Sequence, residues 1–148
     1  MFENILLAVD GSEHSQRAAK AGIEFAKSTQ GKVTALFVID VAKKYEGIGG
    51  VSWNIADEVV LGMEQSLKEC GNDSLKIVSE MAKDAGVPFE SKIVEGQPAV
   101  EIMKTAEDAD MSLIVMGRLG RSGISKFLIG SVADKVLHNS KIPVLMIQ

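Results

Sequence analysis

Five short apolar runs alternate with helical stretches along the chain, and this alternation limits the possible folds more than any other feature. The runs have the length and composition of β-strands. Several are almost wholly apolar, as expected where helices cover both faces of a parallel sheet, whereas residues 89–96 alternate in polarity and are expected at an edge. The five expected strands are residues 4–10, 32–40, 89–96, 111–117 and 142–148.

The segments between these runs show the 3.6-residue period of helices. Ser12 is placed to cap the first of them, and Gly31 is placed to end it. Pro98 is expected at the first position of a later helix. The last helix should begin near Ser131, because Asp134 three residues further on resembles the partner in a capping box.

The middle of the chain is harder to divide. Apolar and small residues stay in helical phase from Ile55 to Ala85, across Gly71, and this predicts one long helix despite the cost of a glycine inside it. The glycine-rich segment from Val41 to Trp53 is expected to be a loop.

Strands that alternate with helices and connect by right-handed crossovers predict a doubly wound α/β domain. We expect residues 1–148 to form one domain with a five-stranded parallel sheet, strand order 3-2-1-4-5, and helices on both faces. Ligands of such sheets bind beyond the carboxyl ends of the strands, where the strand order reverses. That point lies between the first and fourth strands, where residues 9–15 and 117–131 should meet.

The composition narrows the class of protein. Apolar residues make up 46% and charged residues 24%, as is usual for a globular domain, and the net charge of −4 argues against a general nucleic-acid binder. The single cysteine, Cys70, has no partner for an internal disulfide, which fits a reducing compartment. No apolar run has the length of a membrane span, and the N-terminus lacks the features of a signal peptide. We therefore expect a cytoplasmic protein that does not enter a membrane.

Residues 117–131, GRLGRSGISKFLIGS, combine four glycines with three cations and contain no acidic residue. Gly117 and Gly120 let the backbone turn sharply and approach a ligand closely. Gly130 and Ser131 stand at the start of the final helix, where free N–H groups and the helix dipole favour an anion. The segment therefore predicts a phosphate site, to which positive charge could come from Arg118, Arg121 and Lys126.

Two residues on the other side of the expected crevice suit a nucleoside. Asp10 ends the first strand and offers an acceptor to ribose hydroxyls or an adenine amine, and Val38 near the end of the second strand could flank a base. Other interpretations remain open at this point. The glycine segment could be a tight strand-to-helix connection, its cations could be solvated, and Asp10 could cap the following helix.

The spacing Gly117-x2-Gly120-x9-Gly130-Ser131, with "ILLAVDGS" near the N-terminus and "GSVADKVLHNSKIPVLMI" at the end, resembles the ATP-binding branch of the universal stress protein family. The resemblance covers essentially the whole chain. It implies an adenine nucleotide alpha hydrolase-like, Rossmann-like fold, ATP with Mg²⁺, and a homodimer formed through the last strand. The nucleotide-binding residues that it implies are Ala8, Val9, Asp10, Val38, Met116, Gly117, Arg118, Gly120, Arg121, Ser122, Gly130, Ser131 and Val132.

Residues 142–148 also favour a dimer on their own evidence. In the expected order they form an outer strand that is apolar throughout, and an exposed apolar edge invites pairing with another strand. The same strand of a second copy, antiparallel about a two-fold axis, is the simplest cover.

Other nucleotide and catalytic motifs are missing from the sequence. It contains no G-x4-G-K-[ST], no G-x-G-x-x-G, and no recognisable catalytic triad or metal-ligand pattern. We therefore expect a regulatory module of the stress response, whose ATP state is read by an unidentified protein partner. The alternatives are a slow ATPase or phosphotransferase that uses the same pocket and, in third place, a carrier of flavin or another nucleotide.

Overall fold

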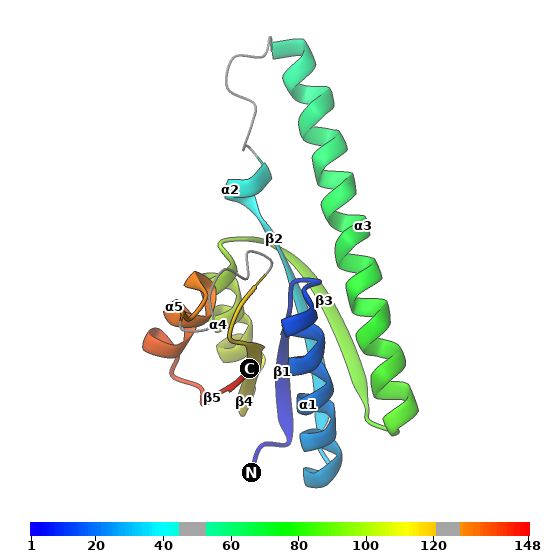
Figure 1. Cartoon of the computed structure of the whole chain (residues 1–148), viewed down its shortest axis with the longest axis vertical. Coiled ribbons are helices and arrows are strands. Elements are labelled where there is room, and N and C mark those ends of the chain that lie inside the picture. Colours follow the sequence, from blue (N-terminus) through cyan, green and yellow to red (C-terminus); the bar gives the residue numbers. More distant parts are fainter. Residues whose placement is uncertain (45–52, 121–127) are drawn as a thin grey trace.

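The computed structural model describes residues 1–44, 53–120 and 128–148, without the side chains of residues 44 and 53–56. Five parallel strands form one sheet in the order β3-β2-β1-β4-β5 (Figure 1). This order confirms the expected fold, including β3 and β5 at the two edges. The strands are β1 (Asn4–Val9), β2 (Lys32–Asp40), β3 (Phe89–Gly96), β4 (Leu113–Gly117) and β5 (Val144–Ile147).

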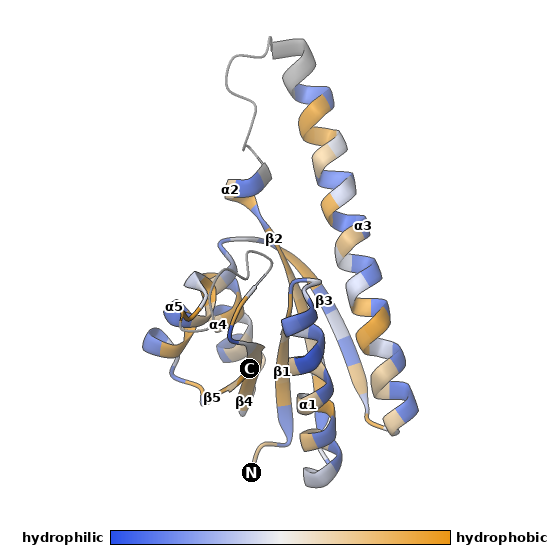
Figure 2. Ribbon diagram, viewed as in Figure 1, coloured by the Kyte–Doolittle hydropathy of each residue, from blue (hydrophilic) through white to orange (hydrophobic). Residues whose placement is uncertain are grey.

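Helices cover both faces of the sheet, so the core has two layers. α1 (Glu13–Thr29) and α3 (Trp53–Ala85) pack on one face, around residues such as Leu7 and Val115. α4 (Pro98–Asp108) and α5 (Ser131–Asn139) pack on the other, around residues such as Leu6 and Ile114. The side chains of successive strand residues therefore pack into opposite layers of the core. Figure 2 shows that β1 is mostly hydrophobic, whereas the edge strand β3 is mixed.

Of the two ends of α1, only the N-terminal one agrees with the expectation from the sequence. Ser12 is the N-cap, as expected, and its hydroxyl accepts a hydrogen bond from the Ser15 N–H at 3.1 Å. At the other end the left-handed residue is Gln30 (φ 55°) rather than Gly31. Gly31 is needed for a different reason, because a Cβ there would lie 2.6 Å from the carbonyl oxygen of Glu3. The glycine lets the chain pass close to the start of β1.

The expected capping box at the last helix is wrong. Gly130 is the N-cap of α5, with no side-chain cap bond, and Ser131 is already the first helical residue. A capping side chain must precede the first turn in order to reach its N–H groups, so the Ser131 hydroxyl cannot cap this helix as a capping box requires. The N-cap residue of α5 therefore makes no side-chain capping bond.

The segment expected to be a loop is helical at both ends. Val41–Lys44 forms the short helix α2, and α3 already begins at Trp53; residues 45–52 lie outside the described residues. α3 is a single helix from Trp53 to Ala85, which confirms the expected continuity across Gly71. Its N-terminal half extends beyond the sheet (Figure 1).

Gly71 is explained by packing rather than by helix termination. A Cβ at this position would lie 2.8 Å from the ring of Phe37 on β2, so only glycine lets α3 approach the sheet so closely. Gly62, on the same helix, is exposed, and a Cβ there would have no neighbour within 4 Å. The two glycines form a matched pair in one helix.

We expect alanine to have opposite effects at these two positions. Gly62→Ala should raise the free energy of unfolding by up to about 1 kcal/mol, through helix propensity alone. Gly71→Ala should lower it by about 1–2 kcal/mol, because overpacking against Phe37 exceeds that gain. Urea unfolding followed by circular dichroism measures both values. Equal stabilisation by the two substitutions would show that the Phe37 ring yields to the added methyl group.

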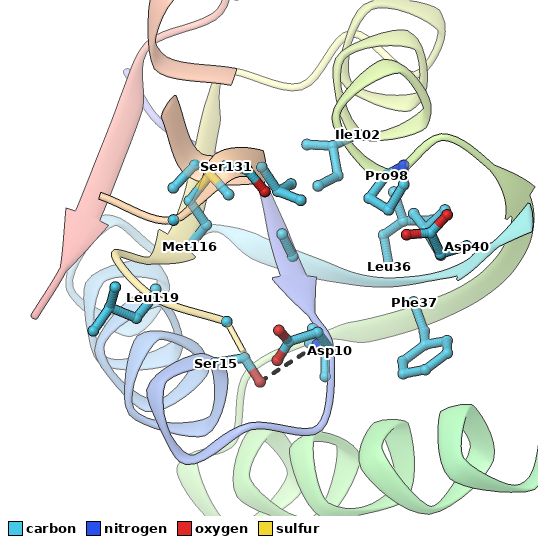
Figure 3. Close-up of a pocket in the computed structure, with 18 of the residues that line it drawn as sticks. Asp10, Ser15, Leu36, Phe37, Asp40, Pro98, Ile102, Met116, Leu119 and Ser131 are labelled. Carbon is cyan, nitrogen blue, oxygen red and sulfur yellow. Dashed lines mark hydrogen bonds between the residues drawn. The ribbon is translucent and has the colours of Figure 1, made fainter. Parts of the chain in front are cut away.

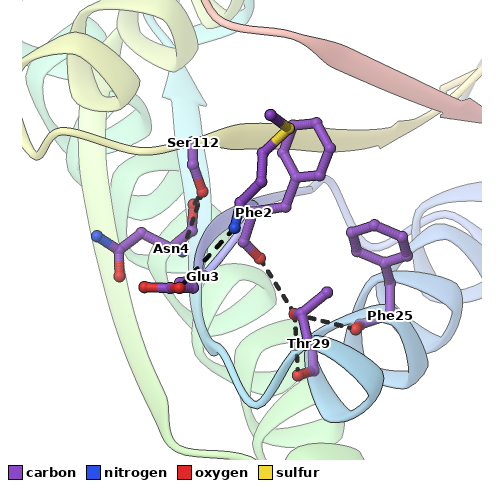
Figure 4. A network of polar contacts seen from close by, with 8 residues as sticks. Phe2, Glu3, Asn4, Phe25, Thr29 and Ser112 are labelled. Atoms are coloured by element: carbon purple, nitrogen blue, oxygen red, sulfur yellow. Dashed lines mark hydrogen bonds and ion pairs between the residues drawn. The ribbon is translucent and has the colours of Figure 1, made fainter.

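Polar contacts tie together the end of the sheet where the strands begin (Figure 4). The Asn4 N–H donates to Ser112 Oγ at 3.0 Å, and that hydroxyl donates to the Asn4 carbonyl at 2.9 Å. The Thr29 hydroxyl donates to the carbonyl of Phe2 at 3.1 Å. These bonds hold β1 to the segment before β4 and to the end of α1. The opposite end of the sheet, where the strands finish, is where the pocket lies.

Candidate functional site

A pocket of about 340 Å³ lies beyond the carboxyl ends of β1, β2 and β4 (Figure 3). β1 stops at Val9, opposite Phe37, whereas β2 continues to Asp40 with partners only on β3. On the other side, β1 pairs with β4. Because the connections from β1 and β4 lead to helices on opposite faces, a crevice opens between them. This is the place that the strand order predicted for a ligand.

The pocket has two chemically different ends. At one end lie the turn after β4 and the first residues of α5, where main-chain groups and glycines predominate. At the other end lie β2 and the start of α4, where Leu36, Val38, Pro98 and Ile102 give a mostly apolar lining. Figure 3 shows Ser131 on the α5 side of the pocket, Asp40 beside Pro98, and Asp10 on the opposite side of the pocket at the end of β1. An elongated ligand with one polar and one apolar end fits this arrangement.

The start of α5 gives the polar end its character. Gly130, Ser131, Val132 and Ala133 all line the pocket, and Gly130 provides no capping side chain. The first N–H groups of a helix have no partner within the helix and carry the positive end of its dipole. They are therefore well placed to bind an anion that enters the pocket.

The turn after β4 passes close to two other segments. A Cβ at Gly117 would lie 3.0 Å from the main chain of His14 in α1, and one at Gly120 would lie 2.9 Å from Oδ2 of Asp10. Both glycines therefore stand where the turn packs tightly against neighbouring segments, and the close approach to a ligand that the sequence predicted for them stays a prediction.

Arg118 connects three parts of the structure through its main chain and side chain. Its N–H donates to the carbonyl of Ile147 in β5 at 2.9 Å, and its own carbonyl accepts from the Gly130 N–H at 2.8 Å. Its guanidinium donates from Nη1 to the carbonyl of Leu128. Arg118 does not line the pocket. In this structure it holds the shape of the turn, and its expected contact to a ligand stays a prediction.

Asp10 is fixed by the turn that leads into α1. Its Oδ1 accepts from the Ser12 N–H at 2.9 Å, while its own N–H donates to Ser15 Oγ at 3.4 Å. Ser15 in turn donates to the carbonyl of Ser12 at 2.9 Å. Asp10 therefore supports the start of α1 while its carboxylate faces the pocket, and the two roles considered from the sequence are compatible.

Most of the residues that the sequence predicted to bind a nucleotide line this pocket. Their common location does not test whether they bind one. Arg118 lies outside the lining, and Arg121, Ser122 and Lys126 are outside the described residues. The expected residues that do line it are Ala8, Val9, Asp10, Val38, Met116, Gly117, Gly120, Gly130, Ser131 and Val132.

Sequence reasoning missed about half of the lining. One signal was present: Asp40 is the polar residue that ends β2, just as Asp10 follows β1, and the carboxyl ends of both strands border the crevice. Leu119 lies in the turn after β4, inside the segment that the sequence singled out, and the others belong to helices or strand interiors whose direction only the fold decides. The missed residues are Ser15, Leu36, Phe37, Asp40, Lys43, Leu67, Pro98, Ile102, Leu119 and Ala133.

The described residues contain no group of three or more His, Cys, Asp or Glu side chains that could hold a metal ion. The two histidines lie on different helices, His14 on α1 and His138 on α5. Within the described part of the chain, none of the helices combines the length and hydrophobicity that crossing a bilayer requires.

Comparison with known proteins gives consistent results. The model of the universal stress protein family matches residues 1–148. The universal stress protein MJ0531 of Methanocaldococcus jannaschii is 37% identical to this chain over 148 residues, which cover all of this chain and 83% of the relative.

Solved structures of similar proteins share the fold. The structure of MJ0577, also from Methanocaldococcus jannaschii, matches with a TM-score of 0.83 and 28% identity, over 99% of this chain and 96% of the other. A universal stress protein family member from Arabidopsis thaliana, with AMP bound, matches with a TM-score of 0.66 and 21% identity, over 97% and 90% of the two chains. At that identity the likeness concerns the fold alone.

Proposed function

The chain belongs to the universal stress protein family, and we propose that its pocket binds ATP, which makes the protein a nucleotide-dependent regulatory module of the stress response. The observation that supports this most is the uncapped start of α5 inside the pocket. Main-chain N–H donors at the start of a helix, next to a turn that contains glycine, form a site for phosphate. The AMP in the Arabidopsis protein is a property of that protein, so the proposal rests on this pocket.

The nucleoside belongs at the other end of the pocket. A base and ribose need apolar surface with a few polar groups that fix their orientation. Val38, Pro98 and Ile102 offer that surface, and Asp10 lies across the pocket from Pro98 and Ile102 (Figure 3). Because β1 ends opposite Phe37, the next residues of β2 have no strand partner on the pocket side. Their main-chain groups can face a bound base.

Magnesium would enter with the triphosphate. Mg²⁺ in nucleotide sites usually keeps several waters and is held by phosphate oxygens with one or two protein ligands. The Ser131 hydroxyl and the Asp10 carboxylate are the oxygen donors of the pocket that such an ion could reach.

The family and the edge strand β5 support a proposal for the assembly and the cellular role of the protein. We propose that residues 1–148 form one nucleotide-binding domain that works in the cytoplasm as a homodimer paired through β5. A further protein partner, still unidentified, would read the nucleotide state. The negative net charge supports a role without nucleic acid.

A slow ATPase is the second candidate, and the position of Asp10 favours it. Its Oδ2 lies close to Gly120 in the turn next to the phosphate end, which places a carboxylate near the proposed phosphates. An ATPase requires a group that orients the attacking water. Phosphate release measured over hours with the wild type and Asp10→Asn would decide this: release that disappears in the variant indicates turnover, and none in either indicates a binding module.

The binding proposal predicts a graded series of affinities. ATP with Mg²⁺ should bind about tenfold or more tightly than AMP, and AMP more tightly than adenosine, because each added phosphate gains donors at the start of α5. Isothermal titration calorimetry with ATP, ADP, AMP and adenosine measures the series. Equal affinity for adenosine and ATP would contradict the placement of phosphate at α5.

A further inference from the structure

Ser15 is a buried polar side chain in the wall of the pocket. It lies in the first turn of α1 with only 4% of its surface exposed, and it lines the cavity. Among the described residues, Thr34 and Ser74 are the other buried polar side chains, and neither lines the pocket. Burying a hydroxyl is unfavourable unless its hydrogen bonds are made, so the partners of Ser15 indicate what it does.

Four hydrogen bonds join Ser15, Ser12 and Asp10 into a closed ring. The Ser15 N–H donates to Ser12 Oγ at 3.1 Å, and the Ser15 hydroxyl donates to the Ser12 carbonyl at 2.9 Å. The Ser12 N–H donates to Asp10 Oδ1 at 2.9 Å, and the Asp10 N–H donates to Ser15 Oγ at 3.4 Å (Figure 3). Because the hydroxyl proton of Ser15 is given to Ser12, the Ser15 oxygen serves Asp10 as an acceptor.

Asp10 lies just beyond the part of β1 that is paired with its neighbours. The last paired residue of β1 is Val9 on the side of β2 and Leu7 on the side of β4. Gly11 follows with φ 84°, so the chain turns immediately after Asp10. A main-chain N–H that leaves the sheet needs another acceptor, and Ser15 supplies one from α1. The ring therefore ties the end of β1 to the first turn of α1.

We propose that Ser15 is the positioning residue for Asp10, and that its hydroxyl holds Asp10 in the orientation that binds the nucleotide. The inference rests on the proposed function, since it requires Asp10 to contact the bound nucleotide. A Cβ at Gly120 would lie 2.9 Å from Asp10 Oδ2, so the carboxylate stands close against the turn after β4. Ser15 acts on the ligand only through Asp10, and its loss should therefore matter only while Asp10 is present.

A double-mutant cycle on ATP affinity tests this dependence. Calorimetric titration with ATP and Mg²⁺ compares the wild type, Ser15→Ala, Asp10→Ala and the double variant. Ser15→Ala should weaken binding about fivefold to tenfold and Asp10→Ala about tenfold or more, the usual effects of losing a neutral and a charged hydrogen-bond partner. The double variant should bind within about twofold of Asp10→Ala, whereas additive losses would mean that Ser15 acts independently of Asp10.

Two further variants separate the hydroxyl from the space that the side chain fills. Ser15→Thr and Ser15→Val add side chains of nearly the same shape, but only threonine keeps the hydroxyl. The threonine variant should bind ATP at least about fivefold more tightly than the valine variant. Hydrogen exchange of the Asp10 amide, measured by NMR without ligand, should be about tenfold faster in Ser15→Ala and Ser15→Val than in the wild type, because its acceptor is gone.

Ser74→Ala provides the matched control. Ser74 is buried in α3, and its hydroxyl donates to the carbonyl of Cys70 one turn back at 2.7 Å, much as the Ser15 hydroxyl does in α1. It lies outside the pocket lining, so this variant removes a buried helical hydroxyl and leaves the ring intact. ATP affinity and Asp10 amide exchange should both stay at the wild-type values. Circular dichroism and thermal melting of each variant check that the fold is retained.

The outcomes separate this inference from the proposed function. If the wild type does not bind ATP, the proposed function fails, while amide exchange still shows whether Ser15 holds Asp10. If ATP binds but Asp10→Ala has no effect, Asp10 is not a binding residue and the positioning role falls with it. Equal ATP affinity of the threonine and valine variants, or unchanged Asp10 exchange in Ser15→Ala, would also overturn the role of the hydroxyl.

Discussion

Gly130→Val is expected to lower the affinity for ATP by about a hundredfold or more while the protein stays folded. A Cβ at Gly130 would already lie 3.2 Å from the carbonyl oxygen of Arg118 and 3.5 Å from the N–H nitrogen of Gly120. A branched side chain would push the start of α5 away from the turn after β4. The proposed phosphate contacts depend on both segments, and losing a few charge-assisted bonds accounts for a hundredfold change.

The backbone of Gly130 should not itself prevent folding of this variant. Its φ of −62° and ψ of 149° are accessible to any residue, so the effect is one of space and not of conformation. Adenosine affinity should fall much less than ATP affinity, because the β2 end of the pocket is untouched. Gly62→Val, on the exposed part of α3, controls for adding the same side chain. A folded Gly130→Val protein that binds ATP like the wild type would show that the phosphates bind elsewhere.

Met146→Pro is expected to convert the proposed dimer into a monomer. The carbonyls of Pro143 and Ile147 accept from Ile114 and Arg118 at 2.9 Å each, so these groups face β4. Main-chain groups of successive strand residues point to opposite sides, so those of Val144 and Met146 face the open edge of the sheet. Proline at 146 removes one outward donor and leaves the inward bonds in place.

The side chain of Met146 needs its own control. It is half-buried against the core layer formed with α4 and α5, so its loss also affects packing. Met146→Ala removes the same packing but keeps the N–H, and this variant should remain a dimer. Light scattering at tens of micromolar, with thermal melts of both variants, measures the difference. A wild type that stays monomeric at high micromolar concentration, or a dimeric Met146→Pro, would contradict pairing through β5.

Arg118 suggests how the two regions could influence each other, since its N–H bonds to β5 and its carbonyl to Gly130. The two variants can therefore be compared directly. If Gly130→Val leaves the dimer intact and Met146→Pro leaves ATP affinity unchanged, pocket and edge are independent, whereas mutual effects would mean that they are coupled.

Much of this protein could be predicted from local sequence patterns. The apolar runs gave the five strands, the phase of residues from Ile55 to Ala85 gave one long helix across Gly71, and strand order placed the crevice. The glycine spacing from Gly117 to Gly130 predicted a phosphate site, and Gly117, Gly120 and Gly130 line the pocket. The strands and the long helix are encoded within single segments, where side-chain period and backbone preference act on neighbouring residues, whereas the strand order follows from the rules for doubly wound sheets.

Only the tertiary structure decided which distant segments meet. Asp40 lines the pocket because β2 runs past the end of β1, and the Arg118 side chain bonds to the Leu128 carbonyl because the chain folds back to Gly130. Gly71 is explained only by the ring of Phe37, more than thirty residues away in the chain. Strand ends, register and close packing depend on contacts between segments, and no periodicity within one segment specifies them.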